Sequence, residues 1–329
     1  MITLSKVVLG LMLVPVLLSA PALADTKTFM PPNTLNKQDK LNAASGITEK
    51  EFNDAIDRAV SIYKPMFEHF GAKLTVNRLW SNSTVNASAE QRSATDWQVN
   101  MYGGLARRAE VTADGFAMVL CHEIGHHLGG YPYVQEWAAD EGQSDQYATS
   151  ACSAKVFAAS LKMGSKAEAE LPAAMKEKCD SSHAADSDRK NCYRSMVAGK
   201  SLADLLAALG GSTKVAFETP DTSKVSKTNH AHPAAQCRLD TYVSGALCGA
   251  SKWDYALIPG KSFDNRNSME AQAEAFGHGC ESGLGARPSC WFVAVNSNTP
   301  EPAPAECPLG DQAMCDIMCE LDPSQPWCK

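Results

Sequence analysis

The stretch CHEIGHHLGG, residues 121–130, decides how this chain is interpreted. Residues four apart on an α-helix are turned by about 40° and share a face, so His122 and His126 can direct both imidazoles at one ion. Glu123 lies one step around the same helix. Two neutral imidazoles with an adjacent carboxylate form the HExxH pattern, in which the imidazoles bind zinc and the carboxylate polarises a water molecule.

The residues around this stretch predict a helix that carries the pattern. Thr112 and Asp114 are both suitable N-caps ahead of an apolar run with helical period, and Gly129 or Gly130 is suited to end the helix. His127 points away from the ligand face of such a helix, so we expect it to be structural or to support a ligand, and not to bind the metal itself.

A zinc hydrolase needs three protein ligands and one open position, so a third ligand must follow. An extended HExxHxxGxxH pattern would need histidine at position 132, which is Pro132. Further along, EGQSDQYA (141–148) offers Glu141 and, four residues later on the same helical face, Asp145. Glu141 can complete the ligand set, and Asp145 can accept a hydrogen bond from a ligand imidazole.

A rival pair has the same spacing, because EWAAD (136–140) supplies Glu136 and Asp140. Glu136 lies only ten residues beyond His126, and a Gly-Gly-Tyr-Pro turn uses much of that distance. We therefore favour Glu141, with a solvated helix face as the alternative role of the rival pair.

The remaining sequence predicts a mainly helical (α+β) fold. Residues 47–70 form an amphipathic pattern with Thr48 as N-cap and Glu51 at the capping-box position. A second long helix is expected over residues 135–162, which are rich in alanine. AKLTVNRLW (72–80) and DWQVNMYGG (96–104) have strand-like composition and predict a small sheet.

Three strings in order resemble the gluzincin peptidases related to the CAAX prenyl protease and the HtpX-type heat-shock protease. They are HEIGH (122–126), EGQSDQYA with Ser144 in place of the usual alanine, and HPAAQCR (232–238). The resemblance implies a zincin-like helical core with one zinc ion held by His122, His126 and Glu141. It also implies that Glu123 is the general base and that Asp145 orients a ligand.

The resemblance covers residues 122–238 and extends to two further groups. It implies that His232 or Arg238 reaches the active site to stabilise an oxyanion, and that residues 96–104 lie at the edge of the substrate cleft. The structural alternative for HPAAQCR is that Pro233 starts a helix, His232 caps it and Arg238 packs with a carboxylate.

The first 24 residues read as a secretory signal peptide, with Lys6, an apolar run and an Ala-Leu-Ala ending. No later segment reaches 18 apolar residues, so no stable membrane span is expected after its removal. A formal net charge of −7 without a dense run of Lys or Arg argues against a nucleic-acid partner.

Twelve cysteines, all beyond residue 24, predict disulfides in an exported chain, and a four-thiolate zinc knuckle is the less favoured alternative. Cys121 is turned off the ligand face, and Cys152 is a candidate partner. The expected organisation is a flexible N-terminal segment (25–46), a zinc metallopeptidase domain (47–250) and a cysteine-rich C-terminal extension (251–329).

These expectations describe an exported zinc-dependent endopeptidase, periplasmic or secreted, that acts on polypeptide substrates in envelope protein quality control. The alternative is a catalytically silent metal-binding or chaperone-like envelope protein that works through its cysteine-rich tail.

Overall fold

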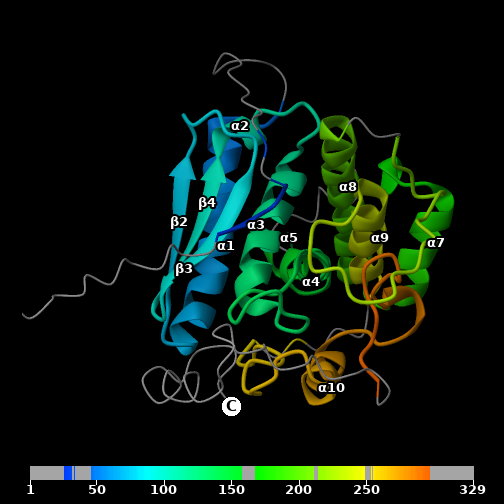
Figure 1. Ribbon diagram of the computed structural model, residues 1–329. Helices are drawn as coiled ribbons and strands as arrows, with labels where there is room; N and C mark the ends of the chain where they lie inside the picture. The colour runs from blue at the N-terminus through cyan, green and yellow to red at the C-terminus, as the bar shows by residue number, and fades with distance from the viewer. Residues whose placement is uncertain are drawn as a thin grey trace, which may run out of the picture.

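Helices dominate the structure, and one small sheet lies to one side of them (Figure 1). The computed structural model describes residues 26–31, 33, 46–157, 167–210, 214–248, 253 and 255–296. This agrees with the expected α+β class. Within these residues, no helix is long and apolar enough to cross a membrane.

The sheet has the strand order β1-β3-β4-β2. Its strands are β1 (Lys27–Thr28), β2 (Lys73–Leu79), β3 (Ala87–Ser93) and β4 (Asp96–Tyr102). β4 is antiparallel to β3 and parallel to β2, whereas β1 adds antiparallel to the outer side of β3. Both strands predicted from sequence are therefore present.

β4 is an internal strand, so the expectation that residues 96–104 form the cleft edge is wrong. Its two sides pair with β2 and β3, because Trp97, Val99 and Met101 alternate toward the buried face and fix its register. On the opposite face, Asn77 donates to Gln98 and Asn100. The edge toward the candidate site belongs to β3 and β1.

Two helices pack on one face of the sheet. α1 (Glu49–His69) lies against β2, α3 (Ala113–Leu128) lies against β3 and β4, and the two helices contact each other. α1 begins with the predicted capping box, in which Thr48 and Glu51 bond reciprocally. α3 is the central helix, since every residue from Gly115 to Leu128 is buried.

The ends of α3 follow the predicted signals. The Thr112 hydroxyl caps the helix by accepting from the Gly115 amide at 3.0 Å, whereas Asp114 pairs with Arg194. The helix stops at Gly129, and Gly130 adopts a φ of 66°, which glycine tolerates without steric cost.

The second helix of the site starts later than predicted. α4 spans Glu141–Tyr147 and continues through a π-helical segment η1 (Ala148–Cys152) into α5 (Ser153–Phe157). Residues 135–140 are not helical, because the Asp140 carboxylate caps α4 by accepting from the Gln143 amide. Residues 158–162 of the predicted helix lie outside the described residues.

The structure has further helical elements besides α1, α3, α4, η1 and α5. Those with both ends among the described residues are α2 (Gly103–Ala106), α7 (Ala173–Ser182), α8 (Asp186–Leu209), α9 (Ala235–Ala246), α10 (Met269–His278) and a 3₁₀ turn η2 (Gly283–Gly285). α8 packs against α3, and α9 packs against both α8 and α4. The helices that carry the predicted ligands, α3 and α4, therefore lie between the sheet on one side and α8 and α9 on the other (Figure 1).

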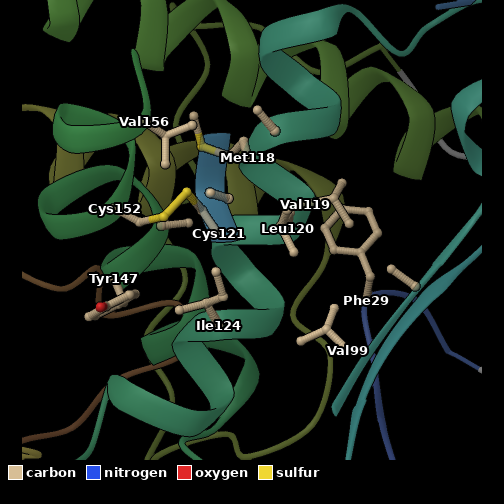
Figure 2. Close-up of a cluster of buried hydrophobic side chains, with 14 of the residues drawn as sticks. Phe29, Val99, Met118, Val119, Leu120, Cys121, Ile124, Tyr147, Cys152 and Val156 are labelled. Carbon is tan, nitrogen blue, oxygen red and sulfur yellow. A yellow bond between two sulfur atoms is a disulfide. The ribbon is translucent and has the colours of Figure 1, made fainter. Parts of the chain in front are cut away.

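Four disulfides are present among the described residues: Cys121–Cys152, Cys179–Cys192, Cys237–Cys290 and Cys248–Cys280. The bond from Cys121 to Cys152 was the pairing considered from sequence, and it ties α3 to the segment that follows α4 (Figure 2). Ile124, Tyr147 and Val156 pack near it. The four cysteines at 307, 315, 319 and 328 lie outside the described residues.

The N-terminal segment departs from the sequence prediction. Residues 25–46 were expected to be flexible and outside the core, but Phe29 and Met30 are 0% and 2% exposed. Phe29 lies between α3 and the sheet (Figure 2). The expectation was wrong here because the composition of a segment indicates local turn preference and not long-range burial.

Part of the predicted C-terminal extension also belongs to the main core. Trp291 is fully buried and lies against Gly142 of α4, where an added Cβ would come within 2.3 Å of the indole ring. Gly142 therefore allows the indole ring of Trp291 to pack directly against α4. The described part of residues 251–329 is docked onto the helix that carries Glu141.

Candidate metal centre

The three predicted ligands come together in the structure. Ligand atoms of His122, His126 and Glu141 all lie within 4.8 Å of one another. Nε2 of His122 is 3.3 Å from Oε2 of Glu141, and Nε2 of His126 is 3.6 Å from Oε1. Because α3 supplies both imidazoles and the first residue of α4 supplies the carboxylate, the site depends on the packing of these two helices.

The facing atoms of these residues have no hydrogen-bond partner among the described residues. They are Nε2 of His122, Nε2 of His126 and Oε2 of Glu141, and their side chains are at most 4% exposed. Buried polar atoms without partners destabilise a protein by about 1–3 kcal/mol each. A cation between them would satisfy all three, and two nitrogens with one carboxylate oxygen are a donor set that zinc accepts.

The outward nitrogen of His122 is held by a chain of charged groups. Its Nδ1 donates to Oδ1 of Asp145 at 2.7 Å. Arg238 donates to both oxygens of Asp145, from Nε at 2.6 Å and from Nη2 at 2.8 Å. Burial lowers the pKa of His122, but Asp145 and Glu141 together outweigh this and raise it to about 9. Burial raises the pKa of Asp145, but Arg238 and His122 hold it well below its usual range.

His126 is held by neutral groups instead. Its Nδ1 lies 2.8 Å from the Ala139 carbonyl oxygen, to which it donates, and 2.9 Å from the Ser144 hydroxyl. Burial lowers the pKa of His126 to about 3. With the hydrogen on Nδ1, the Nε2 lone pair of the neutral ring faces Glu141.

The Glu123 side chain is buried beside the three ligand residues. Neither carboxylate oxygen has a hydrogen-bond partner among the described residues, and the side chain is 0% exposed. Burial raises the pKa of Glu123 to about 8. By contrast, the imidazoles of His126 and His122 outweigh the effect of burial on Glu141 and lower its pKa to about 2. The surroundings of the two neighbouring carboxyl groups therefore shift their pKa values in opposite directions.

His232 reaches the centre, and it is more exposed than the three ligand residues. Its Nε2 lies 3.5 Å from Oε2 of Glu141, and its side chain is 21% exposed. The same nitrogen donates to the Thr28 carbonyl oxygen at 2.7 Å. Burial lowers its pKa. It does not cap a helix, because α9 begins at Ala235 with Ala234 as N-cap.

Arg238 supports the centre from behind. It is 1% exposed, and besides Asp145 it donates to the Phe29 carbonyl oxygen at 2.6 Å. Its Nη2 is 3.4 Å from Nδ1 of His122. Arg238 therefore packs with a carboxylate, as one of the two sequence interpretations held, and its guanidinium is committed to Asp145.

His127 takes no part in the centre. Its ring is stacked between Trp97 and Trp137, at centroid distances of 5.5 and 5.1 Å. Its Nε2 donates to the Gln98 carbonyl oxygen, and burial lowers its pKa to about 4. This agrees with the structural role expected from its position on the helix.

The rival acidic pair is separated from the ligands. Glu136 is exposed on the irregular segment before α4. Asp140 is fully buried, so it does not lie on a solvated face as the alternative supposed. Its carboxylate caps α4 and also accepts from Nδ1 of His230 at 3.2 Å.

Four contacts of the centre were missed by sequence reasoning. Three are made by main-chain carbonyl groups, of Thr28, Phe29 and Ala139. These leave no mark in sequence, because every residue has a carbonyl. The fourth is the Ser144 hydroxyl, and here a signal existed, since serine replaces alanine in the string that resembles the gluzincins.

Comparisons of the chain with protein-family models, with curated proteins and with solved structures give no match.

Proposed function

We propose that the protein is an exported zinc-dependent endopeptidase. The observation that carries this proposal is the cluster of buried, unpartnered ligand atoms of His122, His126 and Glu141, with the unpartnered carboxylate of Glu123 beside them. The order of the three sequence strings, similar to that of gluzincin peptidases, supports peptide hydrolysis over other zinc chemistry. Four disulfides fit an oxidising compartment.

In this proposal the ligand residues hold the zinc ion, and the groups behind the imidazoles orient them. Zinc held by two imidazoles and one carboxylate supplies a Lewis acid that polarises a substrate carbonyl and acidifies water. Asp145 and Ala139 each hold a hydrogen on Nδ1 of one imidazole, so Nε2 of each ring is the nitrogen left to bind the ion.

Glu123 is the group that moves the proton. Its carboxyl group has no hydrogen-bond partner among the described residues, and the raised pKa of about 8 makes its ionised form a stronger base than an exposed glutamate. In that form it would take a proton from water and pass it to the leaving amine. A purely metal-storing site has no need of such a group. The presence of Glu123 therefore favours an enzyme over a catalytically silent metal-binding protein.

His232 is the candidate donor to the oxygen of the scissile carbonyl. Its Nε2–H now points to the Thr28 carbonyl, close to Glu141, and would bond instead, or in addition, to a substrate oxygen. It is the most exposed of the residues that meet at the centre. We therefore expect substrate to approach from the side of His232 and β1.

The test compares the wild-type protein with Glu123→Gln on unfolded casein, with zinc measured by mass spectrometry in both samples. Glutamine preserves the shape of the side chain but cannot accept the proton. We expect cleavage to fall by about 100-fold or more, as for loss of a general base, while the zinc content stays near one per chain.

Chelation provides the matching control, because removing zinc should abolish cleavage by the wild-type protein and adding it back should restore it. Equal cleavage by the wild-type and Glu123→Gln proteins would refute the mechanism. Zinc bound at one equivalent without any cleavage by the wild-type protein would favour the silent metal-binding alternative.

A further inference from the structure

The N-terminal segment Lys27–Met30 touches the candidate centre at two points. The Thr28 carbonyl accepts from Nε2 of His232, and the next carbonyl, of Phe29, accepts from Nη1 of Arg238. The Phe29 ring also lies edge-on to His122, at a centroid distance of 5.3 Å, and Arg238 lies over it at 4.5 Å. Two adjacent residues, about 200 positions from their partners, thus contact both outer groups of the site.

We propose that this segment is a positioning element of the metal centre, in which the main-chain carbonyls of Thr28 and Phe29 hold His232 and Arg238 in their working orientations. The inference rests on the proposed function, because it assigns to the segment a part in the activity of the same site.

The chemistry of a carbonyl oxygen explains how the segment acts. Such an oxygen only accepts, so its bond to His232 requires the hydrogen on Nε2, the nitrogen nearest Glu141. The segment thereby places a donor where a substrate oxygen is expected. On the other side, the Phe29 carbonyl steadies Arg238, which holds Asp145, which in turn holds His122.

The segment is itself clamped at a distance from the centre. The Asn86 side chain accepts from the Met30 amide at 3.1 Å and donates to the Met30 carbonyl at 3.2 Å. The Phe29 amide donates to Ala87, which continues the pairing of β1 with β3. Among the described residues, Asn86 forms its side-chain hydrogen bonds with Met30 and Ala87 and none with His232, Arg238 or a ligand residue, so its amide can be removed without altering those groups directly.

The experiment uses Asn86→Ala in the full exported chain, with Asn77→Ala as the matched control. Both substitutions remove side-chain amide hydrogen bonds, but Asn86 directly precedes β3 and bonds to Met30, whereas Asn77 lies on β2 and bonds to Gln98 and Asn100. We expect Asn86→Ala to lower kcat for casein by about 10-fold with little change in KM, and Asn77→Ala to leave kcat within about 2-fold.

A double variant separates positioning from general loosening. In a His232→Ala background, the loss caused by Asn86→Ala should shrink, because one of the two groups that the segment positions is already gone. Full additivity of the two losses, with similar effects of Asn86→Ala and Asn77→Ala, would overturn the inference and leave the proposed function standing.

A second readout does not depend on activity. Nitrogen NMR of histidine-labelled protein should show His232 with its hydrogen fixed on Nε2 in the wild-type and Asn77→Ala proteins, and a mixture of tautomers in Asn86→Ala. An unchanged His232 signal in Asn86→Ala would refute the inference. Failure of the wild-type protein to cleave casein would count against the proposed function, while this signal would still decide the role of the segment.

Discussion

His122 and His126 lie one turn apart on α3, yet their outward nitrogens face different surroundings. Nδ1 of His122 meets Asp145, which is gripped by Arg238, and all three are buried. Nδ1 of His126 meets the Ala139 carbonyl and the Ser144 hydroxyl, both neutral. One imidazole is therefore held by a chain of charges, and the other by the main chain and a hydroxyl.

The difference shows that the two imidazoles of one centre are oriented by two kinds of support, a carboxylate for His122 and a carbonyl for His126. A carboxylate behind an imidazole raises its basicity and strengthens its bond to a metal, but it brings buried charges that must stay paired. A carbonyl fixes the ring without buried charge, and no side-chain substitution removes it. We expect the charged support of His122 to contribute more to zinc affinity and to be more sensitive to substitution. The neutral support of His126 should contribute less and tolerate substitution better.

Among substitutions of the groups that support the two imidazoles, Asp145→Ala should have the largest effect, because it removes the charged support of His122. The substitution leaves Arg238 buried without its partner, so the free energy of unfolding should fall by about 3–5 kcal/mol. Zinc affinity should fall about 10- to 100-fold. Denaturant unfolding and a competition titration with a zinc indicator measure the two quantities.

Asp186→Ala serves as the control for Asp145→Ala. Asp186 pairs with Lys190 on the exposed surface of α8, so its loss should change neither quantity appreciably. Similar effects of the two substitutions would remove the distinction between a buried and a surface charge pair on which the comparison depends.

A smaller effect is expected when the covalent tie shared by both supports is removed. The double substitution Cys121→Ala and Cys152→Ala opens the bond between α3 and η1 and should lower the free energy of unfolding by about 2–4 kcal/mol. Because the partners of both imidazoles remain, zinc affinity should fall less than in Asp145→Ala. An equal loss of affinity would show that the tie, and not the charged chain, sets the ligand geometry.

The smallest effect should come from Ser144→Ala, on the neutral side. The Ala139 carbonyl still holds His126, so zinc affinity should weaken by less than about 10-fold, the value of one ordinary hydrogen bond. Ser153→Ala is the matched control, since Ser153 is equally buried but bonds to Thr149 and Ser195. A loss as large as that of Asp145→Ala would contradict the proposed asymmetry.

Periodic and capped elements were the part of the fold that sequence could predict. The capping box at Thr48, the glycine stop after α3 and the strand-like composition of β4 are local signals, and all three predicted features appear in the structure. The start of α4 was missed because alanine-rich composition extends upstream of it. Residue 139 stays outside the helix, where its carbonyl reaches His126, a contact that composition does not encode.

The site shows the same division. His122, His126, Glu141 and Asp145 could be predicted because helical spacing places them on common faces. The part played by Thr28 and Phe29 could not, because their carbonyls act across about 200 residues and composition placed them in a flexible segment. Only the fold brings this segment to the edge of β3.

The most direct test of the central claim is the zinc content and affinity of purified Glu141→Ala, measured beside the wild-type protein and Glu136→Ala. We predict one tightly bound zinc per chain in the wild-type protein and in Glu136→Ala, and loss of that zinc in Glu141→Ala. Retention of full zinc affinity by Glu141→Ala, or its loss in Glu136→Ala, would contradict the assignment of His122, His126 and Glu141 as the ligands.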